Sequence, residues 1–386
     1  MEIQELLFHL IRYECCETSA ELDSKTIQPL LPKLYALSQA HDVVHLVSDA
    51  LVKLGMLGED KLSQNFKRQK MVAVLRYERI NFELERICQV LETGQIPFIP
   101  LKGAVLRSYY PEAWMRTSCD IDVLVAKEHL EDAARILTKQ LEYRNAGKGS
   151  HDISMFSPGG VHVELHYELI EDGISKKAGK VLSTVWDQSH PREGSVYYHE
   201  LTDEVFYFYH VAHMAKHVML GGCGIRSFLD LWLMDHRLEY NIARREKLLA
   251  DGELLTFARV TRKTADVWFS EEVPDEIIFR MQEYILQGGI YGTKHNRIVV
   301  GRTRQRGQIH YALGRIFLPY NVIKYHYPIL QKYKWLLPFM ELRRWGKLLF
   351  TGGFHRSIQE LNKSKELSPQ QIAEMDSLLQ ALDLQG

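Results

Sequence analysis

The chain has 386 residues, 46% of them hydrophobic and 25% charged, with a formal net charge of −1. This composition is typical of a soluble globular protein of roughly two or three domains, and it excludes a chain whose overall charge attracts polyanions. The five cysteines form no Cys-x-x-Cys pair, which favours a reducing compartment. No signal-peptide pattern is present and no apolar run approaches the roughly 18 residues of a spanning helix. We therefore expect a cytoplasmic protein without a transmembrane segment.

Helical patterns occupy residues 1–93. Apolar residues recur at helical spacing over residues 64–91, and Gly94 stands where a C-terminal cap is expected. The chain becomes helical again over residues 201–386, where Ser368 begins a capping box ahead of the last helix. The sequence thus predicts helical regions on both sides of a central segment.

The central segment, residues 94–200, alternates between strand and helix patterns. The expected order is a strand in 96–103, a short helix in 104–110, a strand at 120–125, an amphipathic helix in 127–143 and a hairpin that ends near residue 169. We predict an α+β fold in which a small mixed-sheet core is embedded in a larger, mostly helical protein.

Two acidic residues on one predicted strand are the strongest chemical signal. Asp120 and Asp122 lie two residues apart, so their carboxylates share one face of the strand. Carboxylates this close repel each other unless a cation lies between them, and Mg²⁺ prefers such oxygen ligands together with phosphate oxygens. Upstream, Lys102 and Gly103 form a turn where backbone N–H groups can approach a phosphate, and Glu164 offers a third carboxylate on a later strand.

The segment PLKGAVLRSYYPEAWMRTSCDIDVLV resembles the signature of the uncharacterised nucleotidyltransferase family, within the polymerase-beta-like nucleotidyltransferase superfamily. The superfamily pattern is matched by Gly103, by Asp120 with Asp122, and by Glu164. The narrower family pattern is matched by Lys102, Tyr110-Pro111, Arg116, and His166 with Tyr167. The resemblance extends loosely over residues 70–350, and its specific motifs lie in the first 70 residues or so of that range.

The resemblance implies a two-metal reaction. Asp120, Asp122 and Glu164 would hold two Mg²⁺ ions, and an NMP would pass from an NTP, with ATP expected, to an unidentified acceptor as pyrophosphate leaves. Glu164 would draw the proton from the acceptor hydroxyl. Lys102 and Gly103 would bind the nucleotide, and Arg116 would offset phosphate charge, although an ordinary loop arginine is an equally good interpretation.

One position departs from the superfamily pattern. The turn is usually Gly-Ser or Gly-Gly, and here it is Gly103-Ala104, so the hydroxyl that would touch a phosphate is missing. Lys102, Arg107 or Ser108 could compensate, and Ser108 is a predicted nucleotide-binding residue.

Histidines suggest a second metal chemistry. His162, Glu164 and His166 alternate on one strand and could hold a metal for hydrolysis, but this alternative leaves the paired aspartates unexplained. His210, His213 and His217 share one helical face; they resemble part of a helical phosphohydrolase site, for which Asp230 is available, but packing against the core is the simpler interpretation. Because the family resemblance reaches this helix, we expect His213 and His217, with His166, to border the acceptor pocket.

The segment from 291 to 350 contains twelve Lys or Arg residues and one acid, Glu341, with aromatic residues interleaved. Basic helices packed on acidic neighbours are the simpler explanation, and a surface for phosphates, nucleic acid or anionic lipid is the alternative. If Arg302, Arg304 and Arg306 have a function, we favour the nucleotide or acceptor cleft over a nucleic-acid role, because no recognition motif accompanies the charge.

A non-enzymatic alternative is a binding protein or antitoxin that has kept this fold and lost its chemistry. The three acids argue against it, since a dead site need not retain them, and the missing turn hydroxyl argues mildly for it.

Overall fold

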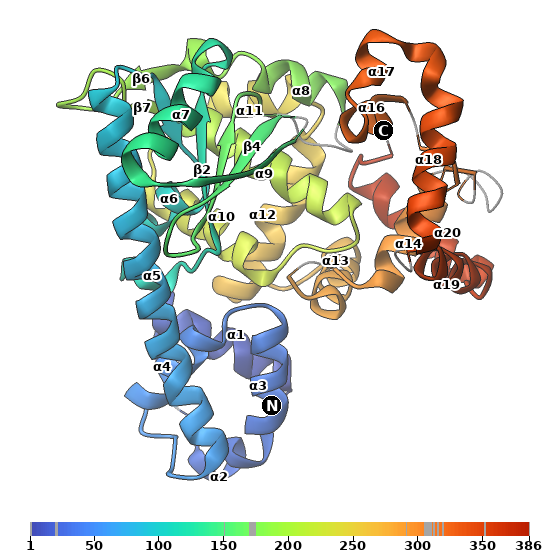
Figure 1. Ribbon diagram of the computed structural model, residues 1–386. Coiled ribbons are helices and arrows are strands. Elements are labelled where there is room, and N and C mark those ends of the chain that lie inside the picture. The colour runs from blue at the N-terminus through green and yellow to red at the C-terminus, as the bar shows by residue number, and fades with distance from the viewer. Residues whose placement is uncertain are drawn as a thin grey trace.

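The computed structural model describes residues 2–19, 22–149, 151–169, 175–290, 292–304, 311, 313–314, 316–318, 320–350 and 353–385. Arg306, one of the cations considered above, lies outside these residues. Within the described part of the chain no helix is long and apolar enough to cross a membrane. The protein consists of a small sheet surrounded by helices (Figure 1), which confirms the predicted α+β class.

The N-terminal region is helical, as predicted. Its elements are α1 (Ile3–Cys15), α2 (Ser24–Ile27), the 3₁₀ turn η1 (Gln28–Leu30), α3 (Leu31–Ala40), α4 (Val44–Lys53) and the long α5 (Lys61–Thr93). Asp60 caps α5 by accepting hydrogen bonds from the backbone N–H groups of Leu62 and Ser63. In Figure 1, α5 leaves the N-terminal helices and runs along the side of the sheet. It ends at Gly94, where an added Cβ would lie 2.6 Å from Cδ1 of Ile136, so the predicted cap also provides space for the helix α7 (Leu130–Leu141).

The central sheet has five strands in the order β1-β2-β5-β4-β3. Its strands are β1 (Phe98–Pro100), β2 (Asp120–Val125), β3 (Arg144–Lys148), β4 (Asp152–Phe156) and β5 (His162–His166). β2 and β5 are parallel, whereas the β1–β2, β3–β4 and β4–β5 pairs are antiparallel. The sheet is therefore mixed, as predicted, and the parallel pair at its centre carries the acidic residues.

Short helical elements connect the strands. They are α6 (Gly103–Leu106), η2 (Arg107–Tyr109), η3 (Ala113–Met115), η4 (Lys127–His129) and α7 (Leu130–Leu141). One face of the sheet packs against α5 and α7, because Val123 of β2 and Val163 of β5 join Ile87 of α5 and Leu137 of α7 in one buried apolar cluster. The alternation of a strand then turns Asp120 and Asp122 toward the opposite face.

The remaining elements are mostly helical. They are α8 (Lys176–Leu182), η5 (Trp186–Gln188), β6 (Ser189–Pro191), β7 (His199–Leu201), α9 (Asp203–Met219), α10 (Ile225–Arg237), α11 (Ile242–Asp251), α12 (Leu255–Phe269), α13 (Glu276–Gly288), α14 (Lys294–Arg304), α16 (Tyr320–His326), α17 (Ile329–Lys332), η6 (Lys334–Leu336), α18 (Leu337–Phe350), α19 (Gly353–Lys365) and α20 (Pro369–Ala381). The predicted capping box of the last helix is present, with Ser368 and Gln371 bonded reciprocally.

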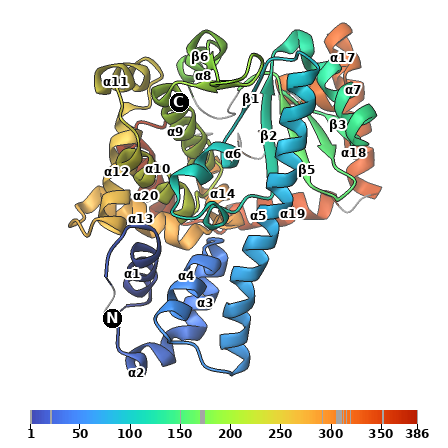
Figure 2. The same ribbon diagram turned by 90° about the vertical axis from the view of Figure 1, so that its left-hand side faces the viewer.

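The main hydrophobic core joins regions that are distant in sequence. Leu7 of α1, Val47 of α4, Phe208 of α9, Phe228 of α10 and Trp268 of α12 belong to one buried cluster. The proposed division into residues 1–93, 94–200 and 201–386 stays a prediction, since helices from both flanking regions share this core. Figure 2 shows α9 and α10 beside the sheet, on the side away from α5.

Two details differ from the predicted elements. β3 was not expected, because all five of its residues are exposed and RNAGK has no apolar face for a pattern to reveal. The second strand of the hairpin ends at His166 and not near residue 169. Both differences lie at the edge or the end of the sheet, where backbone pairing and not side-chain burial defines the strand.

Candidate functional site

The turn after β1 is held close to β2. The backbone N–H of Leu101 donates to the carbonyl of Asp122 (3.0 Å). Lys102 has a φ of 45° and a ψ of −115°, and residues other than glycine rarely adopt a positive φ. Gly103 begins α6, and an added Cβ there would lie 3.1 Å from Cβ of Ser118. The positive φ is thus at Lys102, while Gly103 provides the space that lets Ser118 pack against the turn.

A buried arginine supports the same turn. The Nε of Arg107 donates to the carbonyl of Gly103 (2.7 Å), and its Nη2 lies 3.5 Å from the hydroxyl of Ser118. The guanidinium also lies over the ring of Tyr77, 5.5 Å from its centroid, which is within the roughly 6 Å of a cation–π contact. Arg107 therefore fixes the relative positions of Gly103 and Ser118.

The acidic residues meet across the parallel strands. Asp122 is in register with Glu164, and Asp120 with His162. The imidazole Nε2 of His166 lies 2.8 Å from Asp122 Oδ1 and 3.3 Å from Glu164 Oε2. Ligand atoms of Asp122, Glu164 and His166 all lie within 4.8 Å of one another. The structure thus adds His166 to the predicted cluster, and Asp120 lies on the same face beside it.

Lys102 completes this charge network. Its Nζ donates to Asp122 Oδ1 at 2.9 Å, and the Asp122 side chain is only 4% exposed. Burial would raise the pKa of Asp122, but the charges of Lys102 and His166 hold it far below its ordinary value. Burial raises the pKa of Asp120, and the nearby charge of Asp122 raises it further. The two aspartates are therefore unlike: Asp122 is a paired anion, whereas the ionised form of Asp120 is disfavoured until a cation approaches.

The remaining two members of the network shift in opposite directions. The hydrogen bond from His166 lowers the pKa of Glu164 against the effect of burial. Burial lowers the pKa of His166, but hydrogen bonds with Asp122 and Glu164 outweigh it and raise the pKa to about 9. In the metal-free protein His166 therefore carries the positive charge that separates two carboxylates.

The raised pKa of His166 gives a pH dependence of stability. Because the pKa rises from an ordinary 6.5 to about 9 on folding, the stabilisation is complete below pH 6.5 and is lost as the pH rises through about 9. We expect the melting temperature in EDTA to fall between pH 7 and pH 10. His166→Gln should flatten this fall, and an unchanged slope in that variant would assign the effect to other groups.

A pocket of about 260 Å³ opens beside the acids. Asp120, Asp122, Lys102, Gly103 and Ser118 line one side. The other side is formed by α9 and α10, and its polar lining residues are His210, His213, Lys216, His217, Arg226 and Ser227. The acids of β2 and the cations of α9 and α10 thus line the same pocket. In the sequence, these two helices follow β2 by roughly a hundred residues.

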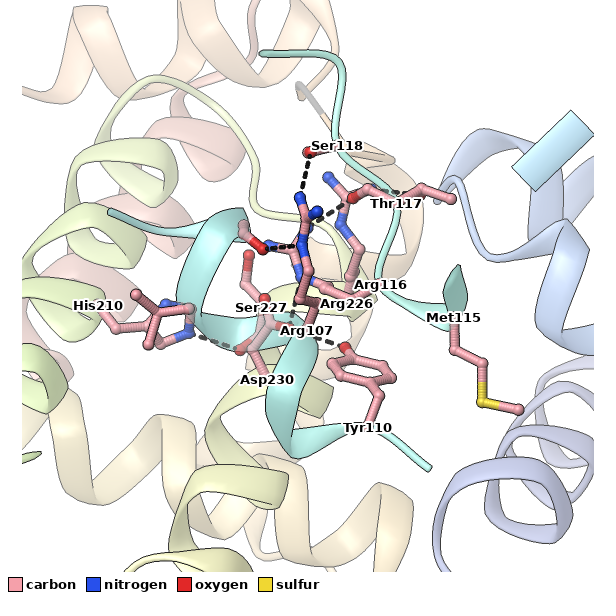
Figure 3. Close-up of polar contacts among 12 residues, drawn as sticks. Arg107, Tyr110, Met115, Arg116, Thr117, Ser118, His210, Arg226, Ser227 and Asp230 are labelled. Atoms are coloured by element: carbon pink, nitrogen blue, oxygen red, sulfur yellow. Dashed lines mark hydrogen bonds and ion pairs between the residues drawn. The ribbon is translucent and has the colours of Figure 1, made fainter. Parts of the chain in front are cut away.

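Arg116 lies in this pocket but already has an acidic partner. Its Nε donates to Oδ1 of Asp230 on α10 (2.7 Å), and Tyr110 donates its hydroxyl to the same oxygen (2.8 Å). Figure 3 shows Asp230 between Tyr110 and Arg116, with His210 nearby. His210 bonds to the carbonyl of Ser227 (3.0 Å). Asp230 therefore joins α10 to the loop before β2 and is not grouped with His213 and His217 as a phosphohydrolase would require.

Arg226 connects the pocket to the N-terminal helices. Its Nη1 lies 2.6 Å from Oδ2 of Asp42 and 3.1 Å from the hydroxyl of Thr117. Lys216 and Arg226, like Ser118, were not singled out from the sequence. Lys216 follows His213 by three residues on α9, so the histidine pattern was a partial signal, but nothing local marked Arg226 as facing Asp120.

The other predicted residues are distributed as follows. His213 and His217 line the pocket, and their Nε2 atoms lie 2.9 Å apart. Ser108 lies outside the lining of this pocket; its hydroxyl donates to the carbonyl of Val105 (2.7 Å). His162 contacts the hydroxyl of Ser154 (2.6 Å), and it is not part of the cluster of Asp122, Glu164 and His166. The structure thus brings together the acids, Lys102, Gly103 and the three helical histidines.

The sequence as a whole was compared with known families. The model of an uncharacterised nucleotidyltransferase family matches residues 31–270, more than half of the chain. The chain belongs to this family. No curated protein and no solved structure matches the chain. The family match begins earlier than the predicted residue 70 and ends before the residues 324–344 that the predicted resemblance included.

Family membership supports nucleotidyltransferase activity in general and implies an NTP as substrate. The matched region contains the acidic strands and the two helices, α9 and α10, that form the opposite side of the pocket. The acids and the cations of the pocket therefore lie within the region that the family model matches, whereas the basic C-terminal segment lies beyond it.

Proposed function

We propose that this nucleotidyltransferase transfers an NMP group, with ATP as the expected donor, to an acceptor hydroxyl in a Mg²⁺-dependent reaction. The acceptor oxygen would form a bond to the α-phosphorus as the bond to the β-phosphate oxygen breaks, and pyrophosphate would leave. One observation carries this proposal: a single pocket has Asp120 and Asp122 on one side and Lys216 and Arg226 on the other. This distribution fits a divalent cation next to a polyphosphate.

The donor set fits a divalent metal. Asp122 and Glu164 provide carboxylate oxygens within 4.8 Å of His166, and Asp120 is available beside them. We assign Asp120, Asp122 and Glu164 as the ligands of two Mg²⁺ ions. When bound, the ions would neutralise phosphate charge and stabilise the charge that develops during in-line displacement. Glu164 would also accept the proton of the acceptor hydroxyl.

The remaining residues would bind the phosphates. Lys102 reaches the acids from the turn and can exchange part of its contact with Asp122 for a phosphate oxygen. Ser118, whose hydroxyl lies beside Gly103 and in the pocket, is a candidate for the hydroxyl that Ala104 lacks. Lys216 and Arg226 would meet the phosphates from the opposite side, while Arg116, paired with Asp230, would mainly position the loop before β2. His213 and His217 remain candidates for the acceptor side of the pocket.

Lys102→Ala should raise the KM for the NTP more than it lowers kcat. Lys102 would meet a phosphate that is already charged in the ground state, and an interaction made equally in ground and transition states affects mainly KM. Steady-state kinetics over a range of NTP concentrations would measure both constants, with Lys102→Arg as the charge-preserving control. An unchanged KM would limit Lys102 to its ion pair with Asp122.

The two rival functions have less support. A His/Glu hydrolase would use His162, Glu164 and His166 together, but His162 is engaged by Ser154 and only His166 is within the cluster. An inactive binding protein would gain nothing from Asp120, a buried residue whose ionised form is disfavoured beside two other acids. Incubation of the protein with each α-labelled NTP, Mg²⁺ and cell extract tests the proposal and identifies the acceptor. We expect one labelled product, and its absence with every NTP would reject the function.

A further inference from the structure

A second large pocket lies at the edge of the sheet, away from α9 and α10. It has a volume of about 790 Å³, which is within the usual range for ligand sites, roughly 300–1,000 Å³. Its basic and aromatic lining comprises Lys127, Lys148, Lys324, Lys334, Tyr167 and Tyr320. We call it the lysine pocket. One side comes from the nucleotidyltransferase core and the other from the basic C-terminal segment.

The lysine pocket carries a strong excess of positive charge. Among the residues that the structure describes, four lysines line it with one acid, Glu168. Glu168 lies 3.3 Å from Lys127, and Lys148 lies 2.7 Å from Glu131, but all four of these side chains are well exposed. Such pairs contribute little in water, about 0–1 kcal/mol, so they do not cancel the attraction of the pocket for an anion. In a chain of net charge −1, this concentration of lysines is a local feature.

The tyrosines are associated with the same cations. Lys127 lies over the ring of Tyr167, with its Nζ 5.4 Å from the centroid, and Lys334 lies over Tyr320 at the same distance. Tyr320 also donates its hydroxyl to the carbonyl of Leu330 (2.8 Å), which fixes its ring against the C-terminal segment. The rings hold ammonium groups at the pocket without neutralising them. The lining is therefore suited to several phosphate groups and not to an apolar ligand.

The lysine pocket lies near the ends of the two strands that carry the acids. Tyr167 directly follows His166 at the end of β5, and Lys127 begins two residues after the end of β2. Because β2 and β5 are parallel, these residues lie at the same end of the two strands. Val125, the last residue of β2, lies three residues after Asp122. Along a strand this spacing corresponds to roughly 10 Å between the acids and the start of the pocket. A ligand of extended shape can reach from one to the other.

We propose that the lysine pocket binds phosphate groups of the acceptor. This inference rests on the proposed transfer to an acceptor hydroxyl, because it assigns the second substrate of that reaction. The acceptor would be an extended, multiply phosphorylated molecule whose reacting hydroxyl lies at the acids while its phosphates contact the lysines. The lysines take no part in bond formation; they bind and orient. An oligonucleotide and a phosphorylated chain without bases both carry such phosphates, and binding experiments separate these two sources.

The test measures binding without turnover. The full-length protein, without NTP or metal, is titrated into fluorescein-labelled hexauridylate and, in a separate series, into a fluorescein-labelled linear polyphosphate of six phosphates, and binding is followed by anisotropy. Unlabelled polyphosphate and hexaglutamate are then added as competitors. We expect Lys324→Ala combined with Lys334→Ala to weaken phosphate binding, roughly tenfold for each contact that is lost. Lys332→Ala is the matched control, because Lys332 is an exposed lysine of α17 outside the pocket lining.

The outcomes are separable from those of the proposed function. Competition by polyphosphate together with direct binding of hexauridylate supports an oligonucleotide source, and binding of polyphosphate alone supports a phosphorylated chain without bases. Equal competition by hexaglutamate, equal weakening in Lys332→Ala, or no binding of either phosphate probe overturns the proposal. If the wild-type protein transfers no label with any NTP but binds the phosphate probes through Lys324 and Lys334, the proposed transfer is rejected while the phosphate-binding role of the lysine pocket stands.

Discussion

Asp120→Asn is expected to abolish nucleotidyl transfer, by on the order of a thousandfold or more, while the metal-free protein keeps or gains thermal stability. The loss of activity follows from the removal of a metal ligand. The gain in stability follows from the raised pKa of Asp120: its stabilising contribution is present below its ordinary pKa and is lost as the pH rises through the folded value. At neutral pH the ionised carboxylate is therefore a cost that Asn removes.

Asp122→Asn should be equally inactive but less stable. Asp122 is the acid that pairs with Lys102 and His166, and Asn leaves both cations without this counter-charge. Measurement of pyrophosphate release and of melting temperature in EDTA, for both variants beside the wild type, separates the two effects. Full activity in either variant would refute the metal assignment, and equal destabilisation of both would refute the unequal roles of the two aspartates.

Asp230→Asn should lower the free energy of unfolding by about 3–5 kcal/mol, because it leaves the buried charge of Arg116 without its acid. Burial alone would raise the pKa of Asp230, but Arg116 and His210 hold it below its ordinary value. This stabilisation is therefore present above pH 3.8 and is lost as the pH falls. The ion pair links α10 to the loop before β2, so the variant should also loosen the pocket.

Urea unfolding at neutral pH measures this effect. The control removes both charges, as Arg116→Met with Asp230→Leu, and should recover most of the lost stability, since replacement of a buried pair by apolar residues is often close to neutral. If Asp230→Asn were as stable as the wild type, the pair would not hold α10 against the core. If the double variant were no more stable than the single one, the loss would come from packing and not from the unpaired charge.

Helices and strands could be predicted from the sequence where a local residue pattern determines their structure. The strand at 120–125 has the bounds predicted from DIDVLV, and α5, the hairpin and the capped last helix are also present. These elements have strong periodicity or a specific cap, which act over a few residues. β3 has neither: its residues are exposed on both faces, and only pairing with β4 makes it a strand.

The candidate site could be predicted only in part, for the same reason. The paired aspartates, Lys102, Gly103 and Glu164 come from neighbouring segments with a recognisable order, and the structure brings them together. Arg226 and Asp230 reach the site through the packing of α10, which no local pattern reveals. His166 was expected near the acceptor, but its position two residues from Glu164 on the same strand face places it among the acids.

The basic C-terminal segment fits neither simple expectation. Arg344 pairs with Glu341 and Arg302 bonds to the carbonyl of Ser364, which is the packing interpretation. Arg343 and Lys334, in contrast, lie over the rings of Tyr327 and Tyr320. Residues 320–334 thereby complete the lysine pocket beside the core. The excess of basic residues was visible in the sequence, but the core residues that face them across the pocket could not be predicted from it.

The most direct test of the account follows the fate of each phosphate of the NTP. The protein is incubated with Mg²⁺, the acceptor fraction and ATP labelled at either the α- or the γ-phosphorus. We expect the α-label to appear in the acceptor and the γ-label to be released only as pyrophosphate. Both the transfer and the release should disappear in EDTA and in Asp120→Asn. Transfer of the γ-label to the acceptor, or release of labelled inorganic phosphate alone, would contradict nucleotidyl transfer.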